Sequence, residues 1–141
     1  MRYIPMSLRR AVIERAANRC EYCKLAQAGQ EATFHIDHVI PIAAGGKTVL
    51  ENLALACVSC SLSKSDRQII SDPETEADVP MFNPRLQRWA DHFYWDEFYL
   101  IGRTPIGRAT IEALNLNRSI IVTIRSEEAF FRRHPPEIPE E

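Results

Sequence analysis

The sequence has no apolar run that approaches the ~20 residues needed to cross a membrane. Its opening stretch, MRYIPMSLRR, lacks the apolar core of a secretory signal. No internal repeat is present. These absences exclude a helical membrane protein and a repeat architecture. With 141 residues, 45% of them hydrophobic and 26% charged, we expect a soluble cytoplasmic protein with a real core and no membrane partner.

An excess of positive charge is also missing, because the formal net charge is −2. Residues 1–70 carry nine basic and six acidic side chains, whereas residues 71–141 carry eight and thirteen. Seven of those thirteen acids lie in residues 72–78 and 137–141. Local patches rather than net charge guide contacts with DNA, so a nucleic-acid partner is not excluded. The pI near 6.1 nevertheless argues against strong non-specific binding.

Cysteine is scarce, but its four copies form two Cys-x-x-Cys pairs with none left over. In a cytosolic chain this pattern indicates metal binding before it indicates disulfides. Zn²⁺ prefers four soft ligands in a tetrahedron, and each tight turn supplies two thiolates. Four thiolates leave no position for a substrate, so we expect a structural zinc site that stabilises a small domain. Its ligands are Cys20, Cys23, Cys57 and Cys60.

Hydrophobic spacing and turn residues predict the elements around these pairs. Helices are expected at 7–18, with Ser7 as N-cap, and at 61–70, 84–93 and 104–114. The last of these begins with Thr104 as N-cap and Pro105 in the first turn. Residues 118–133 fit strand or helix, and their length favours helix. Strands are expected at 33–40 and 50–56, a hairpin at 94–103 with its turn near residues 96–97, and a loop at 71–80.

An aspartate beside a histidine lies between the two cysteine pairs, in the segment Ile36-Asp37-His38-Val39-Ile40. A hard carboxylate oxygen can hold a divalent cation, and an imidazole can take a proton from water near neutral pH. The pair therefore suits metal-assisted hydrolysis. In isolation, however, an Asp-His dipeptide is more often a surface charge pair at the end of a strand.

The order of the motifs around the Asp-His pair favours a functional role for it over a surface charge pair. Cys-x-x-Cys, Ile-Asp-His-Val-Ile-Pro, Gly-Gly, Glu-Asn-Leu, a second Cys-x-x-Cys and Lys64 together closely resemble the HNH nuclease family, also called ββα-metal nucleases. The resemblance covers about residues 15–67. It implies an α+β fold: a ββα-metal, treble-clef-like core with structural zinc, here followed by a mainly helical extension with a short hairpin. We expect the core at 1–70, the extension packed on it at 71–134 and a disordered tail at 135–141.

The resemblance also implies roles by position. His38 matches the general base that activates water, and Asp37 matches a ligand of the catalytic metal, Mg²⁺ or another divalent ion. Asn52 matches the asparagine that holds the loop orienting the base. The third family position, usually a histidine or asparagine ligand, is Ser61 in this chain.

A serine hydroxyl is a poorer metal ligand than an imidazole or an amide carbonyl. Three outcomes are open: Ser61 ligates directly or through water, His35 substitutes for it, or metal affinity is lost. We favour a weakened but occupied Mg²⁺ or Mn²⁺ site formed with Asp37. His35 lies on the same strand face as Asp37, but we expect it to face solvent.

Lys64 and Arg67 are expected to share a face of the helix that carries Ser61. In the ββα-metal fold that helix lies against the duplex, so both are candidate phosphate contacts, with Arg19 as a further one. The leading hypothesis is a metal-dependent endonuclease that hydrolyses phosphodiester bonds in double-stranded DNA. One alternative is a catalytically weak or inactive zinc-ribbon module that binds nucleic acid. A second is a nuclease directed at RNA, or a toxin.

Overall fold

The structure is a computed structural model that describes residues 3–138. It divides the chain into two compact units. The first runs to Asp66 and takes in the short segment Asn83–Arg85. The second comprises Arg67–Phe82 and the residues from Leu86 onward. Residues 139–141, which end the predicted tail, lie outside the described residues.

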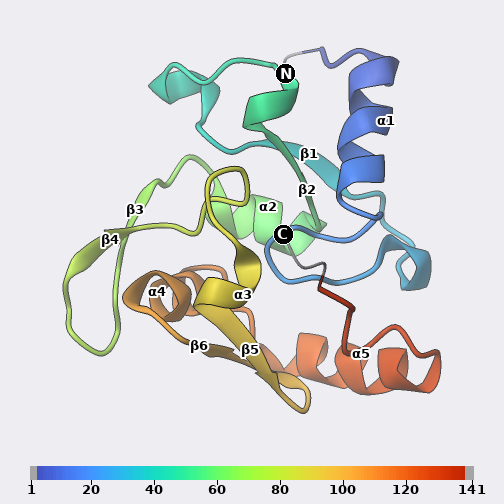
Figure 1. Cartoon of the computed structure of the whole chain (residues 1–141), viewed down its shortest axis with the longest axis vertical. Helices are drawn as coiled ribbons and strands as arrows, with labels where there is room; N and C mark the ends of the chain where they lie inside the picture. The colour runs from blue at the N-terminus through green and yellow to red at the C-terminus, as the bar shows by residue number, and fades with distance from the viewer. Residues whose placement is uncertain (1–2, 139–141) are drawn as a thin grey trace. The chain divides into compact units, whose positions relative to one another are not determined.

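The first unit is built on a β-hairpin that is followed by a helix (Figure 1). β1 (His35–His38) pairs antiparallel with β2 (Leu53–Ala56), so that Asp37 lies opposite Ala54. All four residues of β2 are buried, as expected for a strand whose both faces are covered. α2 (Val58–Lys64) then begins two residues after β2 ends. This ββα order confirms the α+β class that the sequence predicts.

α1 (Met6–Arg15) packs against β2 in the same unit (Figure 1). It begins after Pro5, whose ring fixes φ at −58°. No side chain caps its N-terminus, so the prediction that Ser7 is the N-cap was wrong. Val12 is the helix's buried residue, and the other side chains stay in at least partial contact with solvent. Packing along one narrow stripe therefore joins α1 to the hairpin.

The helix predicted at 61–70 is shorter and starts earlier than expected. Cys57 caps its N-terminus, because the thiol accepts a hydrogen bond from the Cys60 N–H. It ends at Lys64, and Ser65 adopts a φ of +50°, which breaks the helical path. The β-branched residues that follow form a strand instead of a further helical turn.

That strand belongs to a hairpin in a region that was predicted to be a loop. β3 (Ile69–Ser71) pairs antiparallel with β4 (Asp78–Pro80) in the second unit. The Asp72 carboxylate closes the connection, because it accepts hydrogen bonds from the Glu74 N–H and the Thr75 hydroxyl. An aspartate that bonds the backbone two residues ahead is a common way to form a turn.

The helix predicted at 84–93 was largely wrong, because α3 spans four residues only (Trp89–His92). The Asn83 side chain instead accepts a hydrogen bond from the Arg85 N–H and forms a turn. Leu86, which lies within that predicted helix, is 82% exposed. A local side-chain to backbone hydrogen bond has here replaced the helical one.

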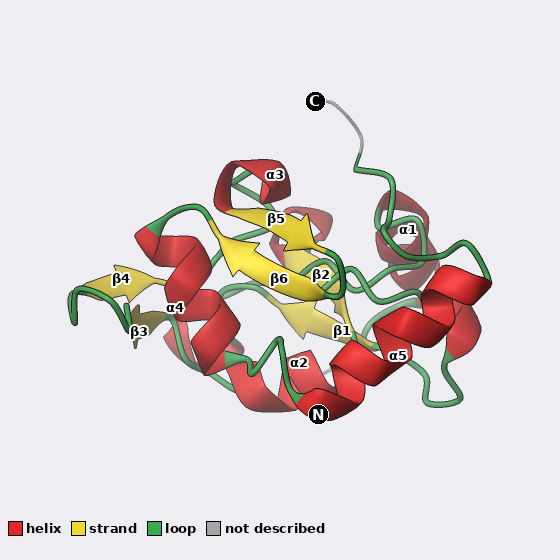
Figure 2. Ribbon diagram, turned by 90° about the horizontal axis from the view of Figure 1, so that it is seen from below, coloured by secondary structure: helices red, strands yellow, loops and turns green. Residues whose placement is uncertain are grey.

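The remaining elements of the second unit agree with the predictions. The hairpin β5 (Phe93–Asp96) and β6 (Tyr99–Gly102) turns at the expected place, and α5 (Ser119–Phe130) is helical. α4 (Pro105–Ala113) begins at the Thr104 N-cap, and it packs against β6 and the β3–β4 hairpin (Figure 2). Among residues 3–138, no helix combines the length and apolar character needed to cross a membrane.

Candidate functional site

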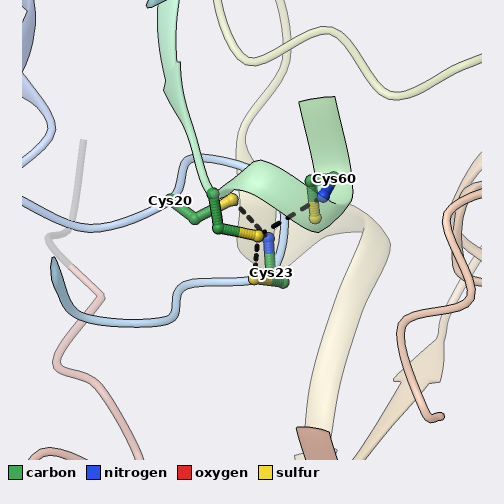
Figure 3. Close-up of side chains that lie close together, drawn as sticks. Cys20, Cys23 and Cys60 are labelled. Carbon is green, nitrogen blue, oxygen red and sulfur yellow. Dashed lines mark hydrogen bonds between the residues drawn. The ribbon is translucent and has the colours of Figure 1, made fainter. Parts of the chain in front are cut away.

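Four cysteines form a compact cluster in the first unit. Cys20 and Cys23 follow α1, whereas Cys57 and Cys60 lie at the start of α2. Their sulfur atoms all lie within 4.8 Å of one another, and all four residues are buried. Figure 3 shows the side chains converging from the two turns. Within the described part of the chain, no other group of three or more His, Cys, Asp or Glu residues meets in this way.

The dimensions of the cluster fit a zinc ion. A tetrahedral Zn–S bond of about 2.3 Å separates neighbouring sulfurs by roughly 3.8 Å. The Sγ atoms of Cys23 and Cys57 lie 3.8 Å apart. Hydrogen bonds from the other thiols hold the pKa of Cys57 well below its usual range, and the same contacts raise the pKa of Cys23 and Cys60. Four buried sulfur atoms that converge at tetrahedral spacing suggest a structural metal such as zinc.

Asp37 lies on the face of β1 that packs against α2. Its Oδ2 atom accepts a hydrogen bond from the Tyr22 hydroxyl at 2.8 Å and forms an ion pair with Lys64 Nζ at 3.2 Å. Burial raises the pKa of the Asp37 carboxyl, while Lys64 and Tyr22 partly offset that rise. Both partners contact the same oxygen of the carboxylate.

His38, the last residue of β1, is half-buried. Its Nε2 atom lies 2.9 Å from the Thr48 hydroxyl, which fixes the orientation of the ring. Its carbonyl oxygen accepts a hydrogen bond from Lys64 Nζ at 3.1 Å. Lys64 therefore binds both members of the Asp-His pair, one through the side chain and one through the backbone.

Asn52 closes the loop that follows His38. Its Oδ1 accepts from the Ile40 N–H at 2.9 Å, and its Nδ2 donates to the carbonyls of Ile40 and Lys47, each at 3.0 Å. One side chain thus binds both ends of the loop at residues 40–47. Gly46 lies against this junction, because a Cβ there would come within 1.7 Å of the Ile40 carbonyl oxygen.

His35 and Ser61 face each other across β1 and α2. The Nδ1 atom of His35 lies 2.9 Å from the Ser61 hydroxyl oxygen. The expectation that His35 faces solvent was therefore wrong: the side chain is half-buried and contacts α2. Two contacts follow one another along the interface between β1 and α2: His35 with Ser61, and Asp37 with Lys64. They are in step because residues two apart on a strand lie on one face, as do residues three apart on a helix.

The candidate phosphate contacts behave differently from one another. Lys64 is 2% exposed and bound to Asp37, so its prediction as a surface contact was wrong. Arg67 lies beyond the end of α2, so the two do not share a helix face, and it donates to the Ala113 carbonyl in the second unit. Arg19 donates to the Lys24 carbonyl beside the first cysteine turn.

Sequence reasoning missed several residues that contact this site, among them Thr48 beside the His38 ring. Tyr22 binds Asp37, and its position between the first two cysteines of the cluster was the signal that could have drawn attention to it. Arg85 forms an ion pair with Glu21 and donates a hydrogen bond to the Leu53 carbonyl. Its side chain therefore contacts the β1–β2 hairpin from a segment far along the chain. No local pattern marks Arg85 for this contact.

The comparisons agree with the resemblance seen in the sequence. Residues 20–67, which contain the cysteine cluster and the ββα elements, match the family model described as HNH endonuclease. This segment is therefore similar to the HNH endonuclease family, whose members generally act on nucleic acid.

One curated relative is the Septu protein PtuB of Bacillus thuringiensis, which is 24% identical over 110 residues. The alignment takes in 77% of this chain but spans only 40% of the length of the relative. No solved structure matches the chain.

Proposed function

We propose that the chain is a metal-dependent endonuclease that hydrolyses phosphodiester bonds in double-stranded DNA. The observation that carries the proposal is the double attachment of the loop at residues 40–47 to Asn52, directly after His38. A loop closed in this way holds the backbone next to His38 in one conformation. The position of these residues within the matched HNH segment supports the same conclusion.

His38 is proposed as the general base. An imidazole accepts a proton near neutral pH, and a positioned base of this kind contributes roughly 10²–10⁴-fold to a rate. The Thr48 hydroxyl orients the ring, and the backbone at His38 is held by Lys64. Activation of the attacking water therefore requires only a proton transfer to a side chain whose orientation is already set.

Asp37 and Ser61 are proposed to hold Mg²⁺ or another divalent ion. Mg²⁺ commonly binds through one or two carboxylates and keeps several waters, so one carboxylate and one hydroxyl are compatible with it. Such an ion would supply positive charge to the oxygen that leaves phosphorus. His35, which contacts Ser61, is the alternative third ligand, and its nitrogen would favour Mn²⁺ or Ni²⁺ over Mg²⁺.

A second candidate function is a zinc-ribbon module that binds nucleic acid with little or no cleavage. The Lys64–Asp37 ion pair favours it, because the ammonium group competes with a metal ion for the carboxylate. Ser61 at the third position favours it as well. Under either function, Arg19 and Arg67 remain the proposed phosphate contacts, and a nucleic-acid partner is common to both.

Cleavage of supercoiled plasmid DNA by the zinc-loaded chain tests the proposal. Mg²⁺, Mn²⁺ and Ni²⁺ are supplied in turn, beside the variants His38→Ala and His92→Ala, and an RNA substrate is run in parallel. We expect nicking that His38→Ala reduces at least a hundredfold and that His92→Ala retains. Binding of DNA without cleavage in the presence of every metal would favour the binding module. Cleavage of RNA alone would show that the substrate is RNA instead of DNA. A Ser61→Asn variant that cuts faster would show that the metal ligand at position 61 limits the rate of the native chain.

A further inference from the structure

Tyr22 joins the cysteine cluster to the proposed catalytic carboxylate. It lies in the tight turn between Cys20 and Cys23, and its side chain is fully buried at 0% exposure. Its hydroxyl donates to Asp37 Oδ2 at 2.8 Å. The residue between two metal ligands is thus hydrogen-bonded to a residue on β1.

Glu21, its neighbour in the same turn, attaches that turn to β2. The Glu21 N–H donates to the Leu55 carbonyl at 2.8 Å, and Glu21 Oε2 accepts from the Leu55 N–H at 2.8 Å. The first cysteine turn therefore binds both strands of the hairpin, one through Tyr22 and one through Glu21. A displacement of this turn would carry Asp37 with it.

We propose that Tyr22 is a positioning residue that fixes the Asp37 carboxylate for the catalytic metal. The inference rests on the proposed function, in which Asp37 is a ligand of that metal. Tyr22 and Lys64 both contact Oδ2, one from the cysteine turn and one from α2. Two partners on one oxygen define the plane and rotation of the carboxylate, so its other oxygen keeps a constant direction. Cysteine ligands held by zinc would in turn hold Tyr22.

A purely structural role is the competing explanation. A buried phenol needs a hydrogen-bond partner, and Asp37 supplies one. Loss of the hydroxyl would then lower stability without a specific effect on metal binding. A positioning role predicts a loss of metal affinity that exceeds any loss of stability. Removal of a partner that orients a metal ligand typically changes metal affinity by about 10–100-fold.

Tyr22→Phe separates the two explanations, with the half-exposed Tyr99→Phe as the matched control. Binding of Mn²⁺ to the zinc-loaded full chain is titrated without DNA, by calorimetry or electron paramagnetic resonance. Zinc content and thermal unfolding are measured on the same samples. We expect Tyr22→Phe to keep its zinc and to bind Mn²⁺ about 10–100-fold more weakly, whereas Tyr99→Phe matches the wild type. In the cleavage assay, the Mn²⁺ concentration at half-maximal rate should rise by the same factor, with a smaller change in the maximal rate.

Equal Mn²⁺ affinity in Tyr22→Phe and the wild type would overturn the inference. A variant that loses zinc or unfolds would also overturn it, in favour of a structural role. Both results leave the proposed function standing if the wild type binds Mn²⁺ and cuts DNA. If the wild type binds Mn²⁺ in neither assay, the proposed function itself fails, so the two failures are distinguishable.

Discussion

Lys64 forms a buried ion pair with Asp37, in which Nζ lies 3.2 Å from Oδ2 and the side chains are 3% and 9% exposed. The same ammonium group donates to the His38 carbonyl. A residue that was expected to meet phosphate on the surface instead holds the interface between β1 and α2. Its charge balances a carboxylate that burial would otherwise drive toward the neutral form.

Replacing Lys64 by Met should therefore destabilise the first unit strongly. Removal of one partner of a buried pair leaves an uncompensated charge, which costs about 3–5 kcal/mol. We expect Lys64→Met to lower the free energy of unfolding in urea by about 3 kcal/mol, with no divalent metal added besides the structural zinc. Arg88→Met is the control, because its ion pair with Asp91 is more than half exposed, and exposed pairs contribute ~1 kcal/mol or less. Equal losses of unfolding free energy in Lys64→Met and Arg88→Met would contradict a buried, stabilising ion pair between Lys64 and Asp37.

The loop at residues 40–47 offers a test in two adjacent glycines. A Cβ at Gly46 would meet the Ile40 carbonyl oxygen at 1.7 Å and Asn52 Nδ2 at 2.8 Å, whereas Gly45 has open space. Gly46→Ala should displace the loop, reduce cleavage about a hundredfold and speed hydrogen exchange at the Ile40 amide. Gly45→Ala, with φ at +91°, should lose about 1 kcal/mol of stability but keep most activity. Comparable activity in the two variants would refute the role given to the Asn52 junction.

Acid should destabilise the second unit through Asp72. Arg108 binds both carboxylate oxygens, at 3.1 Å and 2.9 Å, and these hydrogen bonds hold the pKa of Asp72 well below its ordinary value of 3.8. A depressed folded pKa adds stability above pH 3.8, and that stability is lost as the pH falls further. Asp72→Asn should be less stable than the wild type at pH 7, and its free energy of unfolding should fall less steeply below about pH 4.

Urea unfolding of both proteins between pH 7 and pH 2.5 measures this difference. Zinc release at low pH affects both proteins alike, so the difference between the two curves isolates Asp72. Parallel curves over the whole range would show that the Arg108 contact does not perturb this carboxyl.

Metal analysis of the purified chain should find about one tightly bound zinc per molecule. Removal by a strong chelator should lower the midpoint of thermal unfolding and abolish cleavage, because a structural site of four thiolates contributes its binding energy to folding. Cys57→Ser should show the same loss without a chelator. A purified chain that holds no metal, yet folds with four free thiols, would contradict the zinc assignment.

Several features could be predicted because they depend on neighbouring residues. Two cysteine pairs at tight spacing indicate a metal site, and Thr104-Pro105 marks the start of α4. The β5–β6 hairpin also follows from local alternation and a turn. The helix prediction was wrong where two local signals competed, as at Asn83, whose side chain forms a turn within a stretch of helical spacing.

The sequence by itself determined which groups the site contains: the cysteine cluster, the Asp-His pair, Asn52 and the serine at position 61. Only the tertiary structure decided their partners. Asp37 meets Tyr22 across 15 residues, His38 meets Lys64 across 26, and His35 meets Ser61 across 26. Periodicity reports which face of an element a side chain occupies, but not which element covers that face. Burial of Lys64 follows from how α2 packs on β1, and that packing turns a candidate phosphate contact into the counter-ion of the proposed metal ligand.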